Sequence, residues 1–150
     1  MKVISKRIAL FFLVSAILAS LAVFLEARIK FPPSYLGMMY TVVSVVFSVC
    51  MSVACSLNLT RIKKKSIYTS IKNNIFLVRD TSSALFCAVT FSWLVAQVSE
   101  IYWLTVFSYC LHVLSLLYFV QNFRILQGIN YEIEDKFREY TAKSKNTQIN

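Results

Sequence analysis

The stretch SYCLHVLSLL, Ser108 to Leu117, contains the only histidine of this chain, His112, within a run that has no acidic or basic side chain. The run continues in both directions, from Ile101 to Val120. About 20 apolar residues are enough for a helix to cross roughly 30 Å of hydrocarbon. The stretch therefore predicts a membrane-spanning helix that carries an ionisable ring near its middle.

Three further runs of similar length also lack charged side chains: Ile8 to Leu25, Tyr35 to Leu59 and Thr81 to Val98. A chain of 150 residues that is 57% hydrophobic and contains only two glycines is too apolar for a soluble domain of this size. Helices satisfy their backbone hydrogen bonds within one segment, as lipid requires. We therefore expect an all-α, integral membrane four-helix bundle over residues 1–123, followed by a cytoplasmic segment over residues 124–150.

The first run also has features of a secretory signal, because the charged start MKVISKR precedes an apolar stretch that contains ASLA. Its apolar core is longer than the 7 to 15 residues typical of a signal peptide. An uncleaved first span is the favoured interpretation, and cleavage stays the alternative. Either choice leaves the other three spans in the same orientation.

Basic residues alternate between the two sides of the predicted spans. The N-terminus, the connection between spans two and three, and the tail after Val120 are rich in lysine and arginine, whereas the other side has only Arg28 and Lys30. The positive-inside rule then places both termini in the cytoplasm. The net charge of +9 is explained by this topology. A nucleic-acid interface would need a basic face on a soluble domain, which the sequence lacks.

The connection between spans two and three has an apolar face at helical spacing, formed by Ile67, Ile71, Ile75 and Val78. It predicts a short amphipathic helix in the inner headgroup layer; a cytoplasmic extension of span three is the alternative. Asp80 is the expected N-cap of span three. After span four we expect a cytoplasmic amphipathic helix, with a possible break at Gly128, and a disordered tail over the last ten residues.

Small and hydroxylated residues recur every three or four positions in the spans. The predicted polar seam consists of Ser44, Ser48, Ser52 and Ser56 in span two, Ser92 in span three, and Thr105, Ser108 and Ser115 in span four. Such rows let helix backbones approach closely, so we expect span two to pack on span three through Ser48, Ser52, Ala88 and Ser92. A serine-lined pore is the alternative. No charged residue lies at depth to move an ion, which argues against a channel.

His112 has two interpretations from its position. It is either a neutral histidine of the bundle interior, hydrogen-bonded to a hydroxyl group, or a catalytic or ligand-binding group, because ionisable residues within membranes are often functional. The four cysteines all lie inside predicted spans without C-x-x-C spacing, which favours a packing role. No pattern in the sequence points to a metal ion or a cofactor.

Several short motifs resemble the androgen-induced membrane hydrolases, which split fatty acid esters of hydroxy fatty acids. The resemblance covers about residues 8–123 and rests on Tyr35, Gly37 and Thr41, on LVRD ending at Asp80, and on LHVLSLL with His112. It implies Thr41 as the nucleophile and His112 as its base. A hydroxyl group is a weak nucleophile until an adjacent base removes its proton, so the pairing is chemically consistent.

The composition and topology favour a function in binding. We expect a small polytopic protein that binds membrane lipid, another membrane protein or a second copy of itself, as an accessory, inhibitory or immunity-type subunit. The expected lipid-headgroup residues are Arg61, Lys63, Lys64, Lys65 and Lys72. The alternative is the intramembrane Thr/His hydrolase. A bacterial inner membrane and a eukaryotic endomembrane both fit the sequence.

Overall fold

The computed structural model describes residues 2–25, 33–57 and 65–149, and all regular secondary structure in them is helical. The four helices are α1 (Lys2–Phe24), α2 (Pro33–Ser56), α3 (Lys65–Val98) and α4 (Tyr102–Ile149). Each is long and apolar enough to cross a membrane. The predicted all-α fold with four candidate spans is confirmed.

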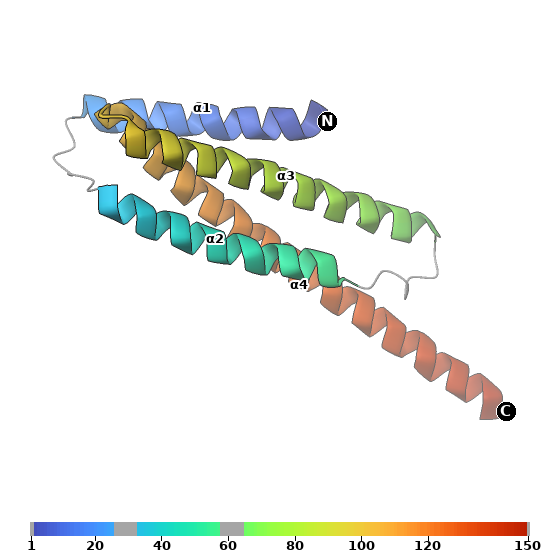
Figure 1. Cartoon of the computed structure of the whole chain (residues 1–150). Coiled ribbons are helices and arrows are strands. Elements are labelled where there is room, and N and C mark those ends of the chain that lie inside the picture. Colours follow the sequence, from blue (N-terminus) through green and yellow to red (C-terminus); the bar gives the residue numbers. More distant parts are fainter. Residues whose placement is uncertain (1, 26–32, 58–64, 150) are drawn as a thin grey trace.

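Successive helices run in opposite directions, so both ends of the chain lie at the same end of the bundle (Figure 1). Pro33 is the first residue of α2, as expected for a residue that has no N–H for the first turn to leave unpaired. Only residues 99–101 separate α3 from α4, and the Ile101 N–H donates to the Ser99 hydroxyl at 3.2 Å. The tight hairpin predicted between spans three and four is confirmed.

Helix α4 is the central element of the bundle. It packs against each of the other three helices, while α1 and α2 lie on opposite sides of the α3–α4 pair (Figure 1). Accordingly, α4 is the most buried of the four candidate spans and α1 the least. The stretch around His112 thus belongs to the helix that holds the bundle together.

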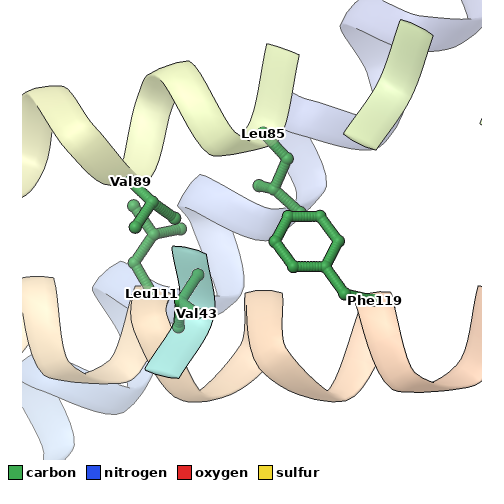
Figure 2. Close-up of a cluster of buried hydrophobic side chains, with 5 residues drawn as sticks. All are labelled: Val43, Leu85, Val89, Leu111 and Phe119. Carbon is green, nitrogen blue, oxygen red and sulfur yellow. The ribbon is translucent and has the colours of Figure 1, made fainter. Parts of the chain in front are cut away.

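Successive inward-facing residues along a helix lie alternately three and four positions apart, which is the pattern of left-handed helix bundles. One buried cluster consists of Val43, Leu85, Val89, Leu111 and Phe119, contributed by α2, α3 and α4 (Figure 2). Figure 2 shows Leu85 and Phe119 pointing toward each other across the α3–α4 interface. The two side chains thus pack within the interface of the two central helices.

The expected short amphipathic helix before span three is not a separate element. Helix α3 is continuous from Lys65 to Val98, so the alternative, an extension of span three, is correct. The apolar face of the extension packs on α4 and the end of α2: Ile75 is buried with Leu126, and Ile71 and Val78 contact this cluster. Asp80 lies inside the helix rather than at its N-cap, and it pairs with Arg79 at 2.8 Å. Packing on α4 outweighs the local capping signal.

Helix α4 likewise continues further than the sequence predicts. Its 48 residues correspond to about 72 Å, more than twice the hydrocarbon thickness. It passes Gly128 without a break and extends to Ile149, where a disordered tail was expected. Leu126 and Ile133 are buried and lie seven residues apart, so the interior face of α4 persists past the span predicted from the sequence, Ile101 to Val120. The C-terminal helix projects from the bundle in Figure 1.

Candidate functional site

His112 lies fully buried at the centre of the bundle. Its Nδ1–H donates to the backbone carbonyl of Ser108, one turn earlier in α4, at 2.7 Å. This bond assigns the proton to Nδ1 and leaves Nε2 as an acceptor. The ring of Tyr40 from α2 meets the imidazole edge to face, with centroids 6.2 Å apart. The predicted interior position is confirmed, but the hydrogen-bond partner is a carbonyl rather than a hydroxyl group.

A hydroxyl pair links the two central helices one turn from His112. Ser92 of α3 and Ser108 of α4 are both buried, and their Oγ atoms lie 3.1 Å apart. Ser92 also donates to the carbonyl of Val89 in its own helix at 3.0 Å. Such a short distance requires small side chains on both helices, as expected where helices associate in a membrane.

The polar residues predicted to face the interior from span four do lie on the inner face of α4. Ser108, His112, Ser115 and Asn122 are buried, and Thr105 is half-buried. Several buried polar atoms of α1, α3 and α4 have no hydrogen-bond partner. Among the described residues they are Ser15 Oγ, Thr81 Oγ1, Ser82 Oγ, Trp93 Nε1, His112 Nε2, Ser115 Oγ, Tyr118 OH and Asn122 Nδ2. A buried polar group without a partner costs about 1–3 kcal/mol. These unpaired atoms therefore lower the stability of the core.

The predicted seam in α2 is not part of the interior. Ser48, Ser52 and Ser56 are exposed on the outside of the bundle, and Ser44 is half-buried. Ser44 and Ser48 donate to carbonyls four residues earlier, at 2.8 and 2.9 Å, and Ser56 donates to Val53 at 3.0 Å. The expectation that α2 packs on α3 through Ser48, Ser52, Ala88 and Ser92 is therefore wrong for Ser48 and Ser52, which are exposed. The serine row forms an outer surface.

Aromatic rings determine which face of α2 points inward. Tyr40 stacks on Trp93 of α3 with centroids 4.6 Å apart, and Phe47 stacks on Phe86 at 4.2 Å. These contacts belong to a row with alternating spacing of four and three that the sequence already contains: Leu36, Tyr40, Val43, Phe47, Cys50 and Ala54. The serines stand beside this row on the helix. The inner face of α2 is therefore marked by this alternating spacing, and not by the row of small residues.

The two residues implied as catalytic by the family resemblance do not meet. Thr41 is exposed on α2, and its hydroxyl donates to the Gly37 carbonyl at 3.0 Å. His112 is fully buried, with Nδ1 bonded to Ser108 and Nε2 unpartnered. Tyr40, the neighbour of Thr41, occupies the side of α2 that faces the imidazole. A side chain added at Gly37 would meet nothing within 4 Å, so helix packing does not require glycine there.

The expected lipid-headgroup residues are only partly described. Arg61, Lys63 and Lys64 lie outside the described residues, as does the side chain of Lys65. Lys72 is half-buried, and its ammonium group lies 5.4 Å from the ring centroid of Phe76. The guanidinium of Arg79 approaches the same ring at 4.7 Å. Arg79 was not among the predicted headgroup residues, although it follows Lys72 by seven residues on one helix face.

The interior role of His112 predicts a graded response to substitution. His112→Gln should leave the free energy of unfolding nearly unchanged, because an amide can donate to the Ser108 carbonyl. His112→Leu should lower it by about 1 kcal/mol, in line with modest hydrogen bonds in membranes. Unfolding in mixed micelles with increasing dodecyl sulfate measures both values. A loss of several kcal/mol in His112→Gln would show that the imidazole has an essential contact other than this bond.

Comparison with protein families, with characterised proteins and with solved structures finds no match to this chain. The resemblance to the androgen-induced hydrolases therefore stays a prediction from short motifs.

Proposed function

We propose that this protein acts by binding another membrane helix, from a partner protein or from a second copy of the chain, through the outer face of α2. One observation carries the proposal. The helix presents an exposed row of small side chains, Thr41, Ser48, Ser52 and Ser56. The hydroxyls of Thr41, Ser48 and Ser56 donate to backbone carbonyls of α2 itself. Rows of this kind let two helix backbones approach closely in lipid, where packing rather than burial drives association.

The proposed partner contact leads to a cross-linking experiment in the native membrane. A photoreactive amino acid placed at Ser48 should form adducts with the bound helix, because this side chain is exposed on the proposed face. The same group placed at Val113, which is exposed on α4, is the matched control. Adducts of twice the chain mass would identify a second copy, and adducts of another mass a partner protein. Equal labelling at both positions, or none at Ser48, would contradict the proposal.

We also propose that both termini face the cytoplasm. Exposed Lys6, Arg7 and Arg124 lie toward the end of the bundle that holds the termini, whereas exposed Tyr35 and Tyr102 begin α2 and α4 at the other end. This distribution follows the positive-inside rule and the preference of aromatic rings for the interface. A reporter that is active only outside the cytoplasm should be silent when fused after Asn150. Activity there would reverse the topology.

The hydrolase stays the alternative function. It requires Thr41 to reach Nε2 of His112, whereas Thr41 faces outward and Tyr40 lies on the His112 side of α2. A general base needs to lie within about 3 Å of the hydroxyl, directly or through one water molecule. No feature of the described geometry favours this function. Hydrolysis of a fatty acid ester by the purified protein, abolished equally by Thr41→Ala and His112→Gln, would support it instead.

A further inference from the structure

We infer that Lys72, Phe76 and Arg79 on α3 form a binding site for the phosphate of an anionic phospholipid in the inner leaflet. The inference is independent of helix binding by α2, whereas its assignment to the inner leaflet rests on the cytoplasmic termini proposed above. It begins from an arrangement in which two cationic groups approach one aromatic ring. The ammonium of Lys72 lies 5.4 Å from the centroid of Phe76, and the guanidinium of Arg79 lies 4.7 Å from it.

The three side chains occupy one face of α3, because their spacings of four and three residues correspond to two helical turns. Phe76 is 42% exposed, although it is large and apolar. Tyr68 extends the same face by one turn, and the Lys72 ammonium lies 5.8 Å from its ring. An exposed face that combines aromatic rings with cations fits the membrane interface, where rings insert between headgroups and cations meet phosphates.

The depth of the site also fits a headgroup. Arg79 precedes Val98, the last residue of α3, by nineteen positions, which correspond to about 28 Å along the helix axis. This length matches the roughly 30 Å of the hydrocarbon core. When Val98 lies at one surface of the hydrocarbon core, Arg79 therefore lies at the opposite surface, from which its long side chain can reach the phosphates. Lys72 is two turns further out and can bend toward the same level over the Phe76 ring.

Asp80 gives the site an internal competitor. Its carboxylate pairs with the Arg79 guanidinium at 2.8 Å, and the side chains are 42% and 46% exposed. An exposed pair of this kind is weak, so a lipid phosphate that offers two charge-assisted hydrogen bonds can replace the carboxylate. The arrangement therefore predicts opposite effects for removal of the cations and removal of the acid.

Spin-labelled lipids provide the test in the full-length protein. The protein is reconstituted in phosphatidylcholine, and the immobilised fractions of labelled phosphatidylglycerol and labelled phosphatidylcholine are compared. We expect at least a threefold preference for phosphatidylglycerol, lost in Lys72→Gln/Arg79→Gln and increased in Asp80→Asn. The control pair Arg7→Gln/Arg124→Gln removes the same charge from exposed positions on α1 and α4 and should retain most of the preference.

The outcomes separate the site from general charge attraction. An equal decrease in both double variants, or no preference in the natural chain, would overturn the inference. Suppression by millimolar glycerol phosphate would show that the site recognises a free phosphate rather than a bilayer lipid, which would also overturn it. Where Lys72→Gln/Arg79→Gln fails to reconstitute, the single change Lys72→Gln takes its place and should reduce the preference at least by half.

Discussion

Phe119→Ala should lower the free energy of unfolding by about 3 kcal/mol, the largest loss expected from a single truncation in this bundle. Phe119 is fully buried, contacts the ring of Phe47 from α2 with centroids 5.5 Å apart, and faces Leu85 from α3 (Figure 2). Truncation would remove packing contacts with two helices at once. In a membrane this loss matters especially, because lipid supplies no separate hydrophobic force between helices.

Leu117→Ala is the matched control for Phe119→Ala. Leu117 lies two residues away on α4 but is 61% exposed, so lipid or detergent can fill the space that its side chain leaves. We expect a change within about 0.5 kcal/mol. Unfolding with dodecyl sulfate in mixed micelles, followed by circular dichroism, measures both variants. Comparable losses would mean that Phe119 is not at the centre of the packed core.

Ser108→Leu should be the most disruptive enlargement, with a loss of about 3 kcal/mol. The Ser108 and Ser92 hydroxyl oxygens lie 3.1 Å apart between the two central helices. Carbon atoms of a leucine need about 3.5–4.0 Å from their neighbours, so α3 and α4 would have to separate. Separation would also disturb the turn of α4 whose Ser108 carbonyl accepts the bond from His112.

Ser52→Leu makes the same chemical change on the outside of the bundle. Because Ser52 is exposed on α2, the enlarged side chain meets no neighbour within the chain and stability should change by less than about 0.5 kcal/mol. It should nevertheless weaken cross-linking from Ser48, since the proposed partner helix would be displaced. Thermal unfolding in mild detergent compares the two variants. If Ser52→Leu unfolds the bundle as readily as Ser108→Leu, the assignment of inner and outer faces is incorrect.

The inner face of α4 was predictable because its polar side chains avoid lipid. In lipid, an imidazole or a carboxamide is costly unless it faces the bundle, so His112 and Asn122 mark the inner face of their helix. The serines of α2 carry no comparable signal. A serine hydroxyl can bond to the carbonyl one turn earlier, as Ser44 and Ser48 do, and then faces lipid at little cost.

The N-terminal extension of α3 illustrates a second limit of local signals. Asp80, with the hydroxyl residues after it, matched a helix N-cap, whereas the structure buries Thr81 and Ser82 within a continuous helix. A cap contributes about 1 kcal/mol, while Ile75 and its neighbours pack against Leu126 over two further turns. The packing of Ile75 on Leu126 therefore determines that α3 continues through Asp80. Leu126 lies 51 positions after Ile75 in the chain, so local sequence does not reveal this contact.

The sequence by itself predicted a lipid environment, the number of helices and their alternating direction. Long uncharged runs cannot leave their backbone groups unpaired in lipid, so each must form a helix, and short connections make neighbours antiparallel. Only the tertiary structure decided which face of α2 is inside. Lipid is as apolar as leucine, so hydropathy cannot distinguish a lipid-facing side from a core-facing side. That choice depends on shape: Tyr40 and Phe47 stack on α3, and the serines are left on the outside.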